Sequence, residues 1–120
     1  MQNESLTNKI ILEKIIDYCD KVEILIERFG SKYENFDSDF GFQMACGMCI
    51  IQIGELITRL SEDFKNKHSE IAWNKIKGMR NIYAHDYESL DLKKIWVTLT
   101  QDVPTLKESL KEIYLTLSED

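Results

Sequence analysis

The spacing of hydrophobic residues along the chain predicts a series of helices. In residues 7–29 the apolar positions advance by alternating steps of four and three, which draws one stripe along a helix. The members of this stripe are Ile11, Ile15, Cys19, Val22, Ile26 and Phe29. Gly30 follows, and glycine suits the left-handed cap that ends many helices. We expect residues 31–36 to form a loop in which Tyr33 and Phe36 fold back onto the core.

The second predicted helix is strongly hydrophobic. It starts near Asp37, Ser38 or Asp39, which are all good N-caps, and continues to about Leu60. Its apolar residues cover more than one face, so we expect this helix to be central or to lie at a subunit interface. Residues 61–68 are mostly polar and are expected to connect it to the next helix.

The second half of the chain predicts further helices. A third spans about residues 69–84, and a fourth opens near residues 89–91 with a buried stripe of Ile95, Trp96 and Leu99. Pro104 predicts a break or kink at residues 102–104, because a helix interior rejects proline. The last helix carries Leu106, Leu110, Ile113, Tyr114 and Leu117. The fold class is therefore all-α, an antiparallel bundle of four to five helices, with residues 1–120 forming a single domain.

Composition supports this picture and limits the function. The 120 residues are 43% hydrophobic and 30% charged, with one proline and five glycines, which excludes disorder and argues against a turn-rich β fold. A net charge of −6 excludes a general polyanion binder. Residues 65–80 nevertheless hold five basic side chains and one acidic one. This segment is either a local patch that attracts RNA or an acidic partner, or a solvated, salt-bridged helix face.

The N-terminal residues, the length of the apolar runs and the cysteines indicate where the protein acts and whether it holds a metal or cofactor. The N-terminal residues do not resemble a signal peptide, and no apolar run approaches the roughly 18 residues of a membrane span, so we expect a cytoplasmic protein without membrane contact. Cys46 and Cys49 form a C-x-x-C pair on the second helix. Cysteines in helices are usually small core residues, so we favour packing over a metal or redox role. We expect no metal and no cofactor.

One segment concentrates chemically capable side chains. Residues 80–87 hold Arg80, His85 and two tyrosines, Tyr83 and Tyr87. Histidine can transfer a proton at neutral pH, and arginine can hold a phosphate and stabilise its negative charge. Together they suit metal-free cleavage of RNA, in which the 2′-hydroxyl attacks the neighbouring phosphate. The structural alternative is that His85 caps the end of the helix and Arg80 forms a surface ion pair.

The spacing of this segment sets a geometric condition. Arg80 and His85 are five residues apart, so on a straight helix they point about 140° away from each other, whereas Asn81 and His85 share a face. Either the helix ends before His85 and the chain turns back, or two copies of the motif meet across a dimer. We favour the dimer, because Ala84 permits close approach and two histidines supply a separate acid and base.

The same residues resemble a known family. The sequence reads Trp73-x2-Ile76-x-Gly78-Met79-Arg80-Asn81-Ile82-x-Ala84-His85-Asp86-Tyr87, followed by Asp91, Ile95-Trp96 and Asp102-Val103-Pro104-x-Leu106, and preceded by Ile53-Gly54-Glu55-Leu56 and Arg59-Leu60-Ser61. Over about residues 50–110 this pattern closely resembles the HepT-like branch of the HEPN superfamily. The specific element is Arg-x4-His-x-Tyr, which is intact here.

The resemblance implies a fold, an activity and a partner. It implies an all-α bundle that dimerises with the two motif copies lining one cleft, and a metal-independent endoribonuclease that is the toxin of a toxin–antitoxin pair. It implies that Arg80 and His85 are catalytic and that Asn81 assists them. The antitoxin in this family is a minimal nucleotidyltransferase that transfers AMP from ATP to the motif tyrosine, here Tyr87, and so silences the nuclease.

Other interpretations stay open. The chain could be a non-catalytic module that binds a nucleotidyltransferase or a nucleotide, or a purely structural dimer; the intact motif favours the nuclease. Tyr87 could instead pack at a helix end, and Tyr83 is expected to pack. Glu55 is expected in a surface or interhelical ion pair rather than in the cleft.

Overall fold

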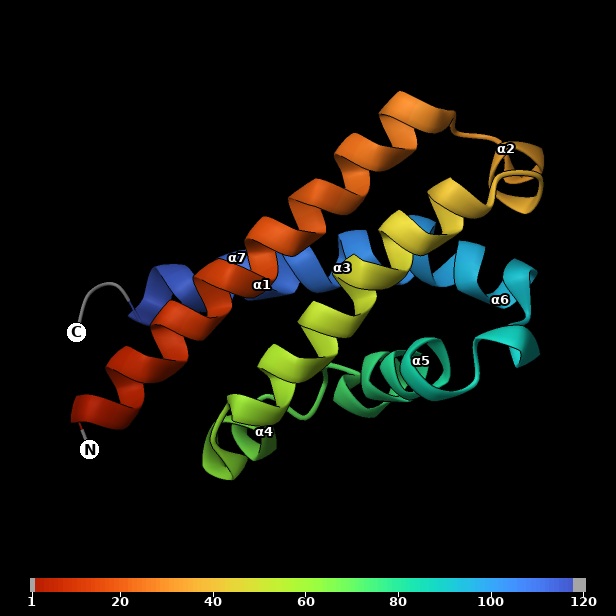
Figure 1. Ribbon diagram of the computed structural model, residues 1–120. Coiled ribbons are helices and arrows are strands. Elements are labelled where there is room, and N and C mark those ends of the chain that lie inside the picture. The colour runs from red at the N-terminus through yellow and green to blue at the C-terminus, as the bar shows by residue number, and fades with distance from the viewer. Residues whose placement is uncertain (1, 118–120) are drawn as a thin grey trace.

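The protein is a bundle of four long helices. The computed structural model describes residues 2–117, with side chains from residue 6 onward, and every regular element among them is helical. The long helices are α1 (Gln2–Phe29), α3 (Phe40–Arg59), α5 (Trp73–His85) and α7 (Val103–Leu117), and the short helices α2 (Tyr33–Asp37), α4 (Glu62–Lys67) and α6 (Leu92–Val97) lie on the connections (Figure 1). The predicted all-α bundle is confirmed.

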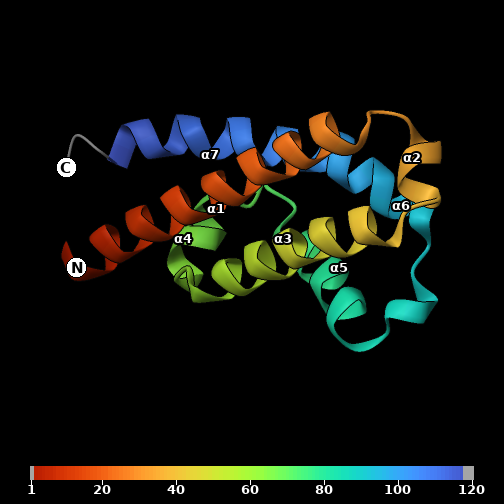
Figure 2. The ribbon, with the colours of Figure 1, turned by 45° about the horizontal axis from the view of Figure 1, so that its top comes forward.

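Successive long helices run in opposite directions. Helix α1 lies beside both α3 and α7, and α3 packs against α5 (Figure 2). The centre of the bundle is filled by aliphatic side chains with no exposed surface, which include Leu12, Ile15, Val22, Ile50, Ile53, Leu99 and Leu110. Four members of the predicted stripe on the first helix are buried there, while Phe29 at its end is 37% exposed. Removal of these apolar side chains from water is the main contribution to the stability of the bundle.

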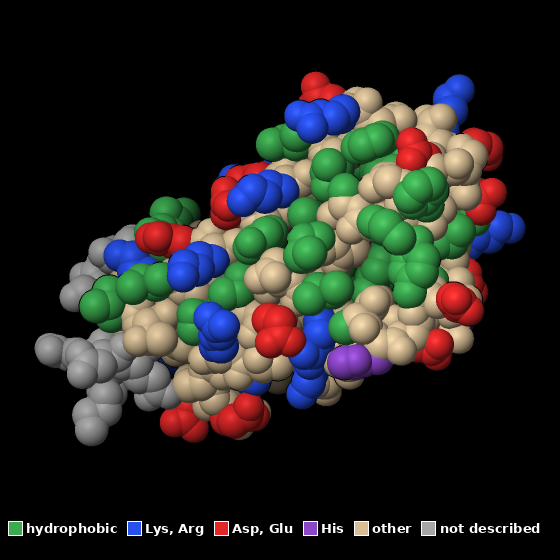
Figure 3. Space-filling view, viewed as in Figure 1, with side chains coloured by type: hydrophobic (Ala, Val, Ile, Leu, Met, Phe, Trp, Pro, Cys, Tyr) green, Lys and Arg blue, Asp and Glu red, His purple; other side chains and the backbone are tan. Residues whose placement is uncertain are grey.

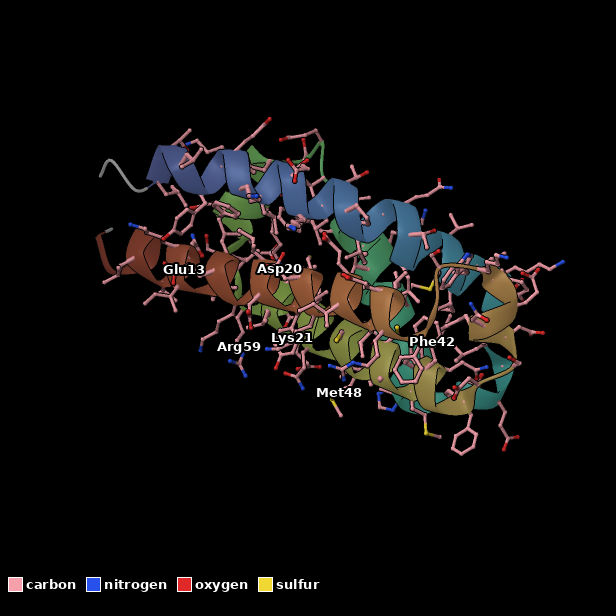
Figure 4. All side chains as sticks on the ribbon, turned by 90° about the horizontal axis from the view of Figure 1, so that it is seen from above. Glu13, Asp20, Lys21, Phe42, Met48 and Arg59 are labelled. Carbon is pink, nitrogen blue, oxygen red and sulfur yellow. The ribbon has the colours of Figure 1, made fainter. Side chains whose placement is uncertain are left out.

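Polar contacts fix α7 against α1. Lys107 on α7 places its Nζ 2.7 Å from Asp20 and 3.0 Å from Glu23, and the Tyr114 hydroxyl donates to Glu13 (Figure 4). The hydrogen bonds to these two carboxylates raise the pKa of Lys107 above its usual range. The contacts lie at several points along α1 and therefore set the register of the two helices.

The corner between α1 and α3 is built from a glycine and a small aromatic cluster. Gly30 has φ +118°, and its N–H donates to Ile26 O at 2.8 Å, as the predicted left-handed cap requires. The predicted loop at residues 31–36 is wrong in part, because residues from Tyr33 onward form α2. Phe36 is fully buried there and its ring lies 5.3 Å from that of Phe42, so the expected return to the core is confirmed.

Two further boundaries differ from expectation. Asp39 is the N-cap of α3 and accepts from the Gly41 and Phe42 N–H groups, which confirms one of the three candidates. The polar residues 61–68 are not a simple connection, because Ser61 caps the short helix α4 by accepting from Phe64 N. Consequently α5 begins at Trp73, later than the expected residue 69. The Trp73 side chain is buried and helps to hold α4 against α5.

The helix widens just before Pro104 and does not break there. Asp91 caps α6, and a π-helical segment, η2 (Thr98–Asp102), carries the chain directly into α7. Pro104 lacks an N–H, and a π turn accommodates an irregular hydrogen-bond ladder without ending the helix. Ile95 and Leu99 are buried as predicted, and the half-buried Trp96 packs against aromatic rings of the α2–α3 corner.

Helix α3 is long and apolar enough to cross a membrane, so the expectation that no segment approaches that length needs correction. Core helices can share this length and composition, and 56% of the apolar stretch of α3 is buried inside the bundle. The three cysteines are free and buried in the same core. Burial raises the pKa of both Cys19 and Cys46 to about 12. Their packing role is confirmed.

Candidate active site

The motif residues lie on the last turns of α5 and just beyond it. Two glycines on α3 let α5 approach closely. A Cβ on Gly54 would lie 2.5 Å from Arg80 Cβ, and a Cβ on Gly47 would lie 2.4 Å from Tyr83 Cε1. Both distances are below any normal contact. Arg80 and Tyr83, three residues apart, therefore form the face of α5 that packs on α3.

Arg80 is held by an ion pair across this contact. Its guanidinium contacts the Glu55 carboxylate on α3, which confirms Glu55 as an interhelical partner. The Arg80 side chain is only 16% exposed, and its Nε is buried without a hydrogen bond among the described residues. A guanidinium carries five N–H donors. Glu55 therefore orients Arg80 while leaving donors for a second acidic group.

His85 has the opposite environment. It is the last residue of α5, its side chain is exposed, and it makes no hydrogen bond or ion pair to the described residues. The cap at this helix end is made by the Asp86 N–H, which donates to Ile82 O, so the His85 side chain is not the cap. Asn81 is exposed one turn earlier on the same face.

The structure does not bring Arg80 and His85 onto one face of the chain. Helix α5 continues through both residues, so the alternative in which it ends before His85 is wrong. At 100° per residue the two side chains leave the helix about 140° apart. Arg80 and Tyr83 face α3, whereas Asn81 and His85 face solvent. Arg80 and His85 of one chain therefore cannot both contact the same phosphate in this arrangement. A site that uses both residues at one phosphate needs one of them from a second copy of the chain.

Tyr87 lies at the start of a short 3₁₀ helix, η1 (Tyr87–Ser89). It is half-buried, and its hydroxyl donates to Gln43 Oε1 at 2.8 Å. The neighbouring Tyr83 is buried and donates to the backbone oxygen of the same Gln43 at 3.2 Å, which confirms its packing role. Burial raises the pKa of Tyr83 far above its usual value. One α3 residue thus contacts both motif tyrosines.

Gln43 was not identified from the sequence. It is 8% exposed, and its Nε2 donates to Phe36 O at 2.8 Å and to Asp37 O at 3.2 Å. The sequence places a single amide side chain in the first turns of an otherwise apolar helix. A buried polar side chain needs hydrogen-bond partners, so this position could have been noticed. That pattern indicates a buried hydrogen bond but does not identify the partner.

An exposed apolar stripe runs along α3 beside this site. Phe40 is 71% exposed, Met44 54% and Met48 57%, and their spacing of four places them on one side of the helix. Figure 3 shows hydrophobic side chains gathered where α3 crosses this face, and Met48 projects away from α1 and α7 in Figure 4. Ile82 on α5 is also exposed. We call Phe40, Met44 and Met48 the α3 stripe; an exposed hydrophobic patch is typical of an interaction surface.

A cavity lined by lysines lies away from the motif. A cavity of about 490 Å³ between α4 and the start of α5 is lined in part by Lys65, Lys75 and Lys77. Two of these cations are already paired, Lys65 with Glu62 at 3.0 Å and Lys75 with Asp102 at 2.9 Å. The basic segment is therefore in part a salt-bridged helix face. Among the described residues no group of three or more His, Cys, Asp or Glu side chains is placed to hold a metal ion.

Known proteins with similar sequences carry ribonuclease names. A protein named "Putative RNase" from Caldanaerobacter subterraneus subsp. tengcongensis is 35% identical over 108 residues, which cover 89% of this chain and 94% of that protein. A "Probable ribonuclease HepT" from Thermococcus cleftensis is 32% identical over 81% of this chain and 89% of its own length. A "Gamma-glutamylcyclotransferase and putative RNase" from Methanocaldococcus jannaschii is 32% identical over 93% of this chain and half of its own length.

No solved structure matches the chain at a significant level. The model of one protein family does match, and it covers residues 10–113, nearly the whole described bundle and every motif residue. The family is described as "Ribonuclease HepT-like", in agreement with the resemblance carried by the Arg-x4-His-x-Tyr residues. This chain belongs to the HepT-like ribonuclease family.

Proposed function

We propose that this protein is a metal-independent endoribonuclease that acts as the toxin of a toxin–antitoxin pair in the cytoplasm. The observation that carries the proposal is the intact Arg-x4-His-x-Tyr motif on a family member, with His85 exposed at the end of α5. A histidine that the fold does not use for packing or capping is free to act on a substrate.

The proposed chemistry is transesterification of RNA. The 2′-hydroxyl attacks the adjacent phosphorus, the bond to the 5′-oxygen breaks, and the products are a 2′,3′-cyclic phosphate and a 5′-hydroxyl. One His85 removes the 2′-hydroxyl proton and another protonates the leaving oxygen. Arg80 holds the phosphate and stabilises its charge, with Glu55 orienting the guanidinium. Asn81, on the His85 face, assists by hydrogen bonding.

The active form is proposed to be a homodimer. Within one chain Arg80 and His85 leave α5 in different directions, so a second copy is needed to complete the site. The α3 stripe and Ile82 supply exposed apolar surface next to the motif, which suits a self-association interface. A two-fold axis near α5 would bring both copies of the motif into one cleft.

The proposed antitoxin is a minimal nucleotidyltransferase that modifies Tyr87. The Tyr87 oxygen attacks the α-phosphorus of ATP, an O–P bond forms, pyrophosphate leaves, and the hydroxyl proton passes to the transferase or solvent. The attached adenylate places a bulky anion two residues from His85, where it repels an RNA phosphate and blocks the cleft. Intact-mass spectrometry after incubation with transferase and ATP should show one added adenylate per chain, absent from Tyr87→Phe.

The nuclease assignment is tested on labelled cellular RNA with EDTA present. Wild type should cleave it and leave 2′,3′-cyclic phosphate ends, and His85→Ala should leave the RNA intact. His68→Gln is the matched control, because His68 is the second histidine of the chain and packs against Phe64 away from the motif. Equal cleavage by wild type and His85→Ala would contradict the proposed mechanism.

A second candidate is a non-catalytic module that binds the nucleotidyltransferase or a nucleotide. It is favoured by two observations: Glu55 partly neutralises Arg80, and the chain carries a net charge of −6, which suits a basic protein partner better than free RNA. Wild type that cleaves no RNA, while its mass shows Tyr87 unmodified, would support this candidate over the nuclease.

A further inference from the structure

We propose that Gln43 is a positioning residue that holds Tyr87 in a closed state, and that Tyr87 must leave Gln43 before its hydroxyl can be modified. Gln43 itself has no part in the motif, and it lies 44 positions away along the chain. The inference rests on the proposed function for the identity of the modifying group, but the closed state of Tyr87 rests on geometry alone.

The Gln43 amide has a fixed orientation. Both N–H donors of its Nε2 are used by backbone oxygens, those of Phe36 and Asp37, at the corner between α2 and α3. The amide oxygen is therefore the atom that faces Tyr87, and it accepts the Tyr87 hydroxyl at 2.8 Å. A buried amide whose three partners are all in place is rigid, because each alternative orientation leaves a polar group unsatisfied.

The same contact restricts access to the Tyr87 oxygen. Its O–H points at a side chain that is 8% exposed, and the Tyr87 ring packs against the core with its centroid 6.2 Å from that of Tyr83. A reagent or enzyme that attacks from solvent needs the oxygen turned outward. Rotation outward breaks the bond to Gln43 and takes the Tyr87 ring off the core, so the open state is a minor one.

Adenylylation of Tyr87 prevents its side chain from returning to Gln43. Once phosphorus occupies the Tyr87 oxygen, no hydrogen remains to donate to Gln43 Oε1, and the 2.8 Å between the two oxygens cannot hold the added group. The modified tyrosine side chain therefore stays outside this contact. Because His85 ends α5 two residues earlier, the adenylate would act on the site by its bulk as well as by its charge.

The test measures the reactivity of individual tyrosine oxygens in the full chain. N-acetylimidazole acetylates accessible tyrosine hydroxyls, and peptide mass spectrometry reports each site, with Tyr18 as the reference within every sample. Gln43→Met keeps the side-chain volume and removes the acceptor for Tyr87. Gln52→Met is the control, because Gln52 lies on the same helix and its amide contacts Met48 instead.

We expect Gln43→Met to raise acetylation of Tyr87 about five- to tenfold over wild type, the effect of losing one hydrogen bond between neutral groups. Tyr83 should stay protected, because it donates to the backbone oxygen of residue 43, which the substitution keeps. Gln52→Met should match wild type. Equal Tyr87 reactivity in wild type and Gln43→Met would overturn the proposal. A parallel rise at Tyr83 would also overturn it, because Gln43 would then support the packing of the whole corner.

A second experiment distinguishes the closed state of Tyr87 from the proposed adenylylation of Tyr87. The same three proteins are incubated with the nucleotidyltransferase and ATP, and the initial rate of adenylate addition is measured. A rate that rises in Gln43→Met in step with acetylation supports both proposals. Acetylation that responds to Gln43→Met while no protein gains adenylate keeps the closed state and withdraws adenylylation. Adenylate added at equal rates to wild type and Gln43→Met overturns the role of Gln43.

Discussion

Arg80 and His85 are the two motif residues whose surroundings differ most. The aliphatic stem of Arg80 fills the space above Gly54 and its guanidinium pairs with Glu55, so it contributes to the contact between α3 and α5. His85 touches no described side chain through a hydrogen bond or ion pair and is exposed. The same proposed reaction therefore uses one residue that supports the fold and one that does not.

Substitution by alanine should separate these two roles. We expect both His85→Ala and Arg80→Ala to abolish RNA cleavage. His85→Ala should change the free energy of unfolding by less than about 1 kcal/mol, whereas Arg80→Ala should cost about 1–2 kcal/mol through lost packing and the lost ion pair. Urea unfolding followed by circular dichroism measures both. A large loss of stability in His85→Ala would return that histidine to a structural role.

The cysteines offer a second prediction at this scale. Because burial raises the pKa of Cys19 and Cys46 to about 12, almost no thiolate forms in the folded protein at pH 8. A thiol reagent such as DTNB should react with none of the three cysteines in the native state and with all three in denaturant. In the native protein reactivity should grow only as the pH rises well above 9. Rapid reaction of the native protein at pH 8 would revive a redox role for Cys46 and Cys49.

Individual site residues could be predicted only where the chemistry is local in sequence. Residues 80–87 form one segment, so their chemical types and spacing could be read together, and the exposed His85 and packed Tyr83 agree with that interpretation. The partner of Tyr87 could not be predicted. Gln43 meets Tyr87 only because α5 packs on α3, and that contact depends on the whole bundle.

At the scale of elements, the contact between α3 and α5 depends on two small residues. Gly47 and Gly54 are seven residues apart, so they lie on one side of α3, and Tyr83 and Arg80 fill the space above them. The glycines are used here for size and not for an unusual backbone angle, since among the described glycines only Gly30 has positive φ. The position of the motif relative to α3 is set by this close packing.

A methyl group at one of these glycines should disturb the site. In Gly54→Ala the new Cβ would lie 2.5 Å from the Arg80 stem, so α5 must shift, and we expect a loss of about 1–3 kcal/mol in stability together with reduced cleavage. Gly78→Ala is the matched control, because nothing lies within 4 Å of its added Cβ and alanine favours the helix by about 0.5–1 kcal/mol. Thermal unfolding of both variants gives the comparison; equal melting temperatures would show that α5 is not packed this closely.

The long helices could be predicted from hydrophobic spacing, and the short ones could not. Residues 33–37 and 62–67 form α2 and α4, although each has too few residues for a periodic stripe. Phe36 and Phe64 are buried and hold these turns in helical form through packing that only the complete bundle supplies. Pro104 correctly marks an irregularity, but sequence alone does not distinguish a π segment from a break.

At the scale of the whole molecule, the apolar surface is more informative than the net charge. The charge of −6 gives no affinity for RNA, and much of the basic segment near α4 is already paired. The α3 stripe, in contrast, leaves a phenylalanine and two methionines exposed on a core helix. A second copy of the chain that covers the stripe would remove this surface from water and place two copies of α5 near each other.

Disruption of the stripe should therefore affect assembly and activity together. We expect Met48→Glu to convert a dimer to a monomer in sedimentation velocity and to lower RNA cleavage at least tenfold while the chain remains folded. Val97→Glu is the control, because Val97 is 43% exposed but lies on α6, outside the α3 stripe. A Met48→Glu protein that stays dimeric would place the interface elsewhere.

The two ends of the described chain lie at one extremity of the 47 Å long axis, and η1 with Tyr87 lies toward the other (Figure 2). A tether attached beyond either end would thus emerge far from the motif. Such polarity lets the bundle be joined to another protein, or to a reporter, without obstructing the tyrosine. Cargo attached before Gln2 or after Leu117 should leave modification of Tyr87 undisturbed, so these sides of the bundle suit immobilisation of the protein when its partners are studied.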